Sequence, residues 1–76
     1  MSELFSVYQF FPDETYERVR EGVGVEEAMR AAQHYCSSVG AQIGTTCRVI
    51  ITDSGDSIVF EWTHGKGITF PQEAAA

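Results

Sequence analysis

The chain has few basic residues: five lysines and arginines stand against eleven aspartates and glutamates, giving a formal net charge of −6. Such a balance favours solubility and repels nucleic acid and anionic membrane surfaces. The chain also lacks a long uninterrupted apolar stretch, so the sequence predicts no membrane-spanning helix. No basic segment followed by an apolar one stands at the N-terminus. We therefore expect no signal peptide and a cytoplasmic location.

Cysteine is also scarce, and in the cytosol Cys36 and Cys47 are expected to be thiols rather than a disulfide. With His34 and His64 they form a Cys2His2 set by residue type, but no pair has the short spacing of a zinc site. On a helix, His34 and Cys36 would also project about 160° apart, because each residue turns the helix by about 100°. The sequence therefore predicts no metal site and no cofactor.

A length of 76 residues corresponds to one domain. A domain of this size buries only about 60% of the surface that its unfolded chain exposes, so its core must be small. Hydrophobic residues make up 43% of the chain, which is too high for a disordered protein. We predict a single folded unit over residues 1–72 and a disordered tail over residues 73–76.

The first part of the chain predicts a β-hairpin followed by a helix. Residues 4–11 and 16–21 form the two strands, joined by a turn that starts at Pro12, and Gly22 then interrupts the second strand. From Val25 the apolar spacing becomes helical. The predicted helix covers residues 25–39 and ends at Gly40. Its apolar side comprises Val25, Ala28, Met29, Ala31, Ala32, Tyr35, Cys36 and Val39.

The next part predicts a second hairpin, with strands over residues 45–52 and 57–63. Ser54 and Gly55 are placed at the tip of its turn, because this register puts apolar side chains together on one face and opposite charges together on the other. The predicted cross-strand pairs are Ile51 with Ile58, Val49 with Phe60, Cys47 with Trp62 and Arg48 with Glu61.

The stretch Gly-Lys-Gly at 65–67 reads either as a phosphate-binding loop or as a tight turn. A P-loop needs another glycine where Phe60 stands and a serine or threonine where Gly67 stands, so that motif is absent. A three-residue hairpin loop instead needs a left-handed residue at its last position, which Gly67 supplies. This turn predicts a further strand that sets Phe70 beside Trp62. A weak anion-binding turn remains the alternative; its residues are Gly65, Lys66 and Gly67.

The element order β-β-α-β-β(-β) predicts an α+β two-layer sandwich, with one amphipathic helix packed on an antiparallel sheet. A single helix covers one face, which leaves apolar residues on the other, and such patches mark interaction surfaces. The small core also favours a homodimer or higher homo-oligomer. The predicted interaction surface consists of Phe5, Val7, Phe11, Arg18, Arg20, Ile50 and Val59.

The leading functional hypothesis is a non-enzymatic, self-associating protein-interaction or structural module, whose further protein partner the sequence does not name. The alternative is a nucleic-acid-binding module that uses aromatic residues with Arg18 and Arg20, because RNA-recognition sheets stack bases on aromatic side chains. A third hypothesis is a small-ligand or enzymatic site near Cys47, Trp62 and His64. A thiol buried among apolar neighbours has a raised pKa and is inert, which disfavours catalysis there.

Overall fold

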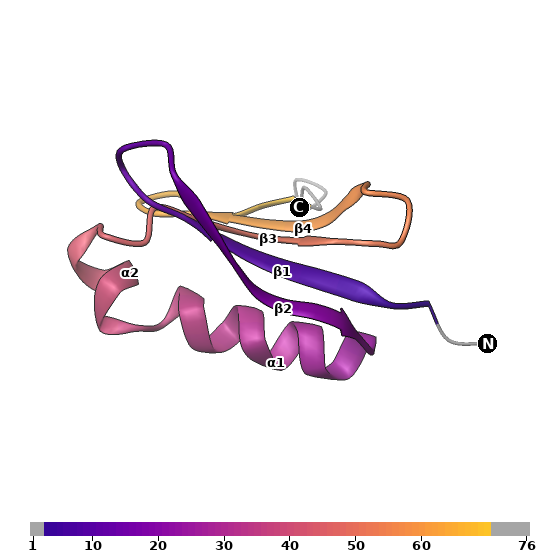
Figure 1. The fold of residues 1–76 in the computed structure, drawn as a ribbon. Coiled ribbons are helices and arrows are strands. Elements are labelled where there is room, and N and C mark those ends of the chain that lie inside the picture. Colours follow the sequence, from indigo (N-terminus) through magenta and orange to yellow (C-terminus); the bar gives the residue numbers. More distant parts are fainter. Residues whose placement is uncertain (1–2, 71–76) are drawn as a thin grey trace.

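The computed structural model describes residues 3–70 as a five-stranded antiparallel sheet with a helix packed against one face (Figure 1). The strand order is β2-β1-β3-β4-β5. This confirms the predicted α+β two-layer sandwich. The predicted tail over residues 73–76 lies outside the described residues. The elements are β1 (Phe5–Phe10), β2 (Tyr16–Val23), α1 (Val25–Cys36), α2 (Val39–Ile43), β3 (Arg48–Thr52), β4 (Ile58–Thr63) and β5 (Gly67–Phe70).

The first hairpin, β1 with β2, is confirmed. In its turn the Asp13 carboxylate accepts hydrogen bonds from the Thr15 hydroxyl at 2.6 Å and from the Thr15 backbone N–H at 3.1 Å. These bonds lower the pKa of Asp13. Gly22 does not end β2 as predicted, since the strand continues to Val23. Gly22 has a φ of 64°, and the pairing with β1 shifts register around it, so the glycine forms a bulge.

The predicted end of the long helix at Gly40 is wrong, because α1 ends at Cys36. Ser38 starts a second short helix, its hydroxyl accepting a hydrogen bond from the Ala41 backbone N–H at 3.1 Å. Serine side chains compete for backbone groups in this way and favour helix starts over helix interiors. Gly40 lies inside α2, and the left-handed glycine that ends the helical region is Gly44, with a φ of 89°.

The second hairpin forms, but its predicted register is wrong. Val49 pairs with Trp62 rather than with Phe60, and Phe60 instead pairs with Ile51. The turn is one residue longer than predicted, because the Asp53 carboxylate accepts hydrogen bonds from the backbone N–H groups of residues 55 and 57. A β-bulge at Val59 adds a second residue, so the register is displaced by two residues in all. Side chains alternate along a strand with a period of two, so this displacement keeps the predicted β3 residues facing the helix.

The Gly-Lys-Gly stretch belongs to a turn between β4 and β5. Thr63 pairs with Gly67, so the loop proper is residues 64–66, and the Lys66 backbone N–H donates to the Thr63 carbonyl at 3.0 Å. Gly67 has the predicted left-handed conformation, with a φ of 83°. The predicted pairing of Trp62 with Phe70 is wrong. Ile68 takes that place, and Phe70 pairs with Glu61 on the opposite face.

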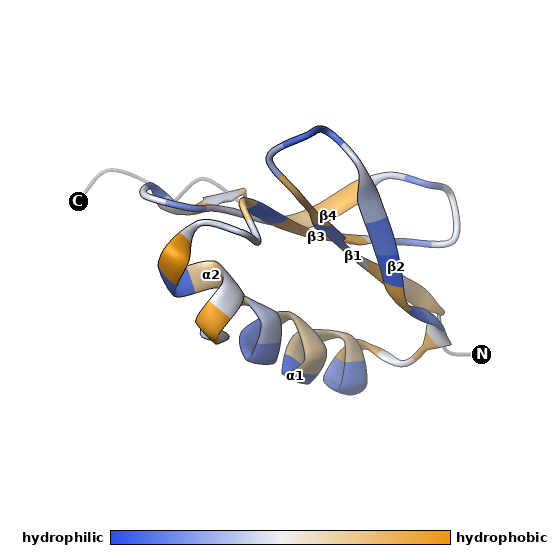
Figure 2. Cartoon of the chain, turned by 60° about the vertical axis from the view of Figure 1, so that its left-hand side comes forward, coloured by the Kyte–Doolittle hydropathy of each residue, from blue (hydrophilic) through white to orange (hydrophobic). Residues whose placement is uncertain are grey.

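The core lies between α1 and the centre of the sheet. Its buried members are Val7, Val49, Ile51, Ala28, Ala31 and Ala32. Three alanines allow the helix backbone to approach the sheet closely, and Figure 2 shows the polar side of α1 turned away from the sheet. Val25, Met29 and Val39 are exposed, although the helical pattern predicts them to be buried.

Candidate interaction surfaces

The helix α1 packs on β1, β2 and β3, which lie toward one side of the sheet. Beside it, over β4 and β5, a hollow of about 290 Å³ opens to solvent. A second hollow of about 410 Å³ adjoins it, because both are lined by Met29 and Phe60. We call the two together the α1–β4 groove. Its first part is lined by Met29, Ala32, Gln33, Cys36, Phe60, Trp62, Gly67 and Ile68.

This first part of the α1–β4 groove contains no charged residue, in a chain with a net charge of −6. Aromatic walls come from Phe60 and Trp62 on β4, and Met29 on α1 stands opposite them. Partial burial raises the pKa of the Cys36 thiol to about 11. The thiol is therefore protonated at neutral pH, and the groove is an apolar surface without a reactive nucleophile.

A different surface lies on the face of the sheet opposite α1. The Phe10 and Tyr16 ring centroids are 5.4 Å apart, and those of Tyr8 and Tyr16 are 5.8 Å apart. The Arg18 guanidinium lies 5.5 Å from the centre of the Tyr8 ring, and that of Arg48 lies 5.1 Å from the centre of the Phe10 ring. We call these five residues the aromatic–arginine patch.

Both arginines of the patch are also held by carboxylates. Arg18 lies 3.1 Å from Glu21, and Arg48 lies 2.5 Å from Glu61. The Arg48–Glu61 pair was predicted as a direct cross-strand pair, but Glu61 stands opposite Ile50 and reaches Arg48 diagonally. The patch therefore offers aromatic surface whose neighbouring positive charges are largely compensated.

The residues predicted as one interaction surface occupy several environments. Val7 and Ile50 are buried, Phe5 packs against the core, and Phe11 is half-buried after β1. Val59 lines the α1–β4 groove on the helix side of the sheet. These positions do not form a single patch.

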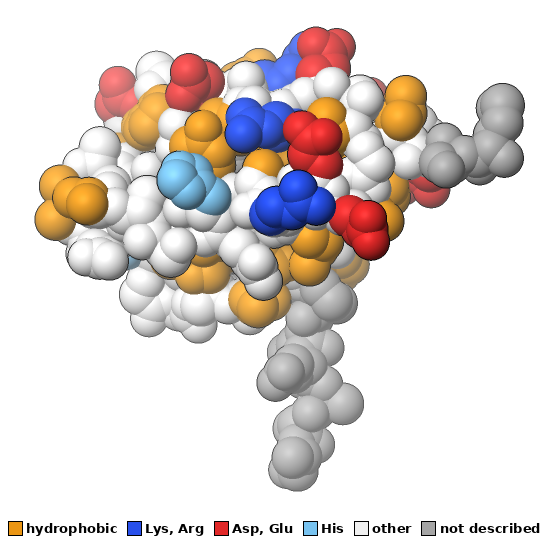
Figure 3. Space-filling model, turned by 90° about the horizontal axis from the view of Figure 1, so that it is seen from below, with side chains coloured by type: hydrophobic (Ala, Val, Ile, Leu, Met, Phe, Trp, Pro, Cys, Tyr) orange, Lys and Arg blue, Asp and Glu red, His pale blue; other side chains and the backbone are white. Residues whose placement is uncertain are grey.

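The two predicted arginines also lie apart. Arg18 belongs to the aromatic–arginine patch, whereas Arg20 turns toward the helix and lies 3.7 Å from Glu27. Arg20, Arg30 and His34 line a hollow on the helix face, and Figure 3 shows that face with its arginine, glutamate and histidine side chains. The sequence pattern missed this separation because the bulges in β2 change the directions of its side chains.

The third hypothetical site, at Cys47, Trp62 and His64, is only partly assembled. The His64 and Trp62 rings meet edge to face with centroids 6.3 Å apart. The hydrogen bond between His64 and Cys47 joins their backbones, from the His64 N–H to the Cys47 carbonyl. The His64 imidazole packs beside Gly44, where an added Cβ would lie 3.5 Å from its Nε2 atom. Among residues 3–70, no three histidine, cysteine or acidic side chains gather as a metal site would require.

The remaining predicted site is the anion-binding turn at Gly65, Lys66 and Gly67. The Lys66 backbone N–H already donates within the turn.

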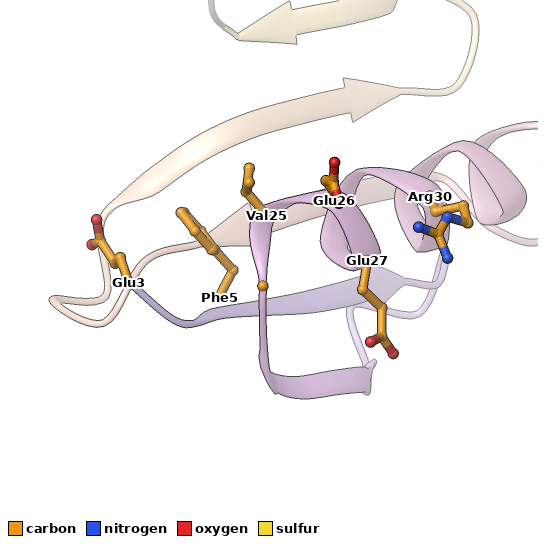
Figure 4. Close-up of a pocket in the computed structure, with 7 residues that line it drawn as sticks. Glu3, Phe5, Val25, Glu26, Glu27 and Arg30 are labelled. Atoms are coloured by element: carbon orange, nitrogen blue, oxygen red, sulfur yellow. The ribbon is translucent and has the colours of Figure 1, made fainter. Parts of the chain in front are cut away.

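A hollow of about 710 Å³, larger than either part of the α1–β4 groove, lies at the start of α1, where Figure 4 shows Glu3, Glu26 and Glu27 around it together with Arg30. This hollow is open and carries mixed charge, in contrast to the first part of the α1–β4 groove, which no charged residue lines.

No family model matches the chain, and comparisons with curated proteins and with solved structures gave no significant match. Within the part of the chain that the structure describes, no helix combines the length and the apolar character needed to cross a bilayer. The α1–β4 groove and the aromatic–arginine patch are therefore the basis for a functional proposal.

Proposed function

We propose that this chain is a non-enzymatic interaction module of the cytosol that associates with copies of itself. The observation that supports this proposal is the incomplete cover of the sheet by α1. Along the α1–β4 groove, Val25, Met29 and Ile68 are 55%, 42% and 59% exposed. Large apolar side chains gathered in one groove mark an interaction surface more strongly than the same residues scattered singly.

The size of the domain favours the same proposal. A short chain buries a small core, and oligomerisation is one of the ways in which small domains gain stability. Here the fully buried aliphatic side chains are few and three alanines fill the helix side of the core. A partner that covered Met29, Trp62 and Ile68 would extend that core over β4 and β5.

The native mass of the chain, measured by size-exclusion chromatography with light scattering, tests the proposal. We expect a dimer or larger oligomer for the unaltered chain and dissociation for Met29→Lys, because a charge in the groove would be desolvated by a partner. Gln42→Lys is the matched control, since Gln42 is exposed on α2 and should tolerate the same change. A monomer at high protein concentration would contradict the proposal.

A second candidate function is the binding of single-stranded nucleic acid by the aromatic–arginine patch. Tyr8, Phe10 and Tyr16 offer stacking surfaces on an open sheet face, with Arg18 and Arg48 beside them. Base stacking on aromatic side chains supports binding in RNA-recognition sheets. The net charge of −6 and the carboxylates that pair with both arginines weigh against it.

Fluorescence anisotropy with a labelled single-stranded RNA at low salt separates the two candidates. Under the second one, the oligonucleotide binds, and Tyr16→Ala weakens binding without changing the native mass. Absence of binding at low salt would eliminate this candidate, because electrostatic attraction to phosphates is strongest there.

A further inference from the structure

The sheet has two edge strands that differ in their suitability for pairing with another chain. The edge strand β2 carries charged side chains and pairs with β1 through two register shifts, with Gly22 in a left-handed conformation. Its charged residues are Glu17, Arg18, Arg20 and Glu21. Charged side chains protect an edge strand against further pairing, and β2 carries four of them whereas β5 carries none. The β2 edge is therefore closed to a partner strand.

The edge strand β5 differs from β2 in charge, although it too has a register shift in its pairing with β4 and begins at Gly67 in a left-handed conformation. Its four residues, Gly67–Phe70, are uncharged, and Ile68 and Phe70 are 59% and 43% exposed. In the described part of the chain β5 pairs only with β4, which leaves the other side of its backbone available for hydrogen bonds. Ile68 lies on the groove side, opposite Trp62, and Phe70 lies on the other face, opposite Glu61.

We infer that β5 pairs antiparallel with β5 of a second copy around a two-fold axis, joining the two sheets into one. This inference rests on the proposed self-association and names the contact through which it occurs. A two-fold axis sets the same strand against itself, so any charge near the axis meets its own kind. In a chain with a net charge of −6, the uncharged β5 avoids that repulsion.

A stable dimer interface needs more area than β5 can bury, so the α1–β4 groove belongs to the same interface. A stable interface buries about 800 Å² on each partner, which is about 15% of the 5184 Å² accessible surface of the chain. A strand of four residues cannot supply this area by itself. The α1–β4 groove opens at Gly67 and Ile68, directly beside the β5 edge. Paired β5 strands would therefore bring the two grooves together at the axis, where apolar side chains of one copy cover those of the other.

Single cysteine substitutions along the edge test this arrangement. Ile68→Cys, Thr69→Cys and Phe70→Cys are each oxidised, and new intermolecular disulfides are assigned by peptide mapping, so that Cys36 and Cys47 can stay in place. Directly opposed residues of an antiparallel pair have Cβ atoms about 4.5–5.5 Å apart, close enough for a disulfide after small adjustments. We expect the position nearest the axis to cross-link at least about tenfold faster than Glu17→Cys, the matched control on the β2 edge.

The native mass of Ile68→Lys completes the test, with circular dichroism to verify that this variant stays folded. Disruption to a folded monomer is expected, because two lysines would face each other near the axis. If the unaltered chain is a monomer, the inference and the proposed function both fail. If it is an oligomer that Met29→Lys dissociates, but Ile68→Lys stays oligomeric and no β5 position cross-links, only the β5 pairing is overturned.

Discussion

The two halves of the sheet are built from similar residues and reach different degrees of burial. In the half formed by β1 and β3, Val7, Val49 and Ile51 are buried under the alanines of α1. In the half formed by β4 and β5, Phe60 and Trp62 are only partly buried, and Ile68 is exposed. The difference lies in the cover above the strands, because one helix is too narrow for five strands that lie about 4.8 Å apart.

This contrast shows that an apolar side chain on the helix side of the sheet is not always part of the core. Val49 and Trp62 are direct neighbours across β3 and β4, yet only Val49 is fully buried. The covered half contains the hydrophobic core. The open half keeps apolar surface that a partner can bury, and for this reason we place the proposed interface there.

Ile51→Ala compared with Ile68→Ala should give the largest difference between the two halves. Removing the fully buried Ile51 side chain leaves a cavity and should lower the free energy of unfolding by about 2–5 kcal/mol. Ile68→Ala removes a side chain that already meets solvent and should cost less than about 1 kcal/mol. Urea unfolding at one low protein concentration measures both. Equal losses would show that the open half is as well packed as the covered half.

Ala31→Leu should have the next largest effect. Ala31 lies buried between α1 and the sheet, and extra methylene groups there must push the helix outward. Overpacking of this kind costs about 1–3 kcal/mol of unfolding free energy. Gln33→Leu on the same helix is the control, because Gln33 is exposed beside the groove and should change stability by about 0.5 kcal/mol or less. If both variants unfold at the same temperature, the close approach of α1 to the sheet does not contribute to stability.

Gly67→Ala should lower the free energy of unfolding by about 1 kcal/mol. Gly67 starts β5 with a φ of 83°, while an added Cβ would meet nothing within 4 Å, so the expected loss comes from backbone conformation alone. Gly55→Ala in the β3–β4 turn is the control, because Gly55 has no positive φ. Thermal unfolding of the two variants decides whether the β4–β5 turn depends on glycine. Tolerance of alanine at Gly67 would favour a role for this stretch other than the turn.

Ionisation of the Cys36 thiol should have the smallest effect on the free energy of unfolding, and burial of the thiol should clearly slow its alkylation. Burial beside the groove raises the pKa of this thiol from 9.0 to about 11. The folded state therefore holds the proton more tightly, and this contribution to stability is present below pH 9.0 and lost as the pH rises through about 11. Iodoacetamide labelling at pH 8, followed by mass spectrometry, should modify the native chain more slowly than the urea-unfolded chain. Equal rates would show that the groove does not shield the thiol.

Residue patterns were sufficient to predict much of this fold, and the failures have physical causes. The hairpins and the start of the helix at Val25 follow from local propensity and spacing. The end of the helix does not, because the hydroxyl groups of Ser37 and Ser38 redirect the backbone before the apolar pattern stops. The β3–β4 register was missed because the Asp53 carboxylate enlarges the turn and a bulge at Val59 adds a further residue to β4.

The candidate surfaces were harder to predict than the elements. The sequence indicated that one helix would leave apolar residues uncovered, but it placed them on the outer face of the sheet. Met29 and Ile68 instead border a groove on the inner face, because the strand order sets β4 and β5 beyond the reach of α1. The sequence hypothesis combined aromatic residues with Arg18 and Arg20. In the folded chain, Arg18 and Arg48 lie beside the aromatic rings, and Arg48 comes from β3.

The charge, the hairpins, the amphipathic helix and the glycine that turns the chain into β5 can all be read from the residues alone. These features depend on neighbouring residues, whose propensities and spacing act locally. The folded chain was needed to show which strands lie under α1, which edge of the sheet carries no charge and which charges meet across the sheet. Those outcomes depend on how elements far apart in the chain pack together, because β1 lies beside β3 and thereby moves β4 and β5 to the uncovered side.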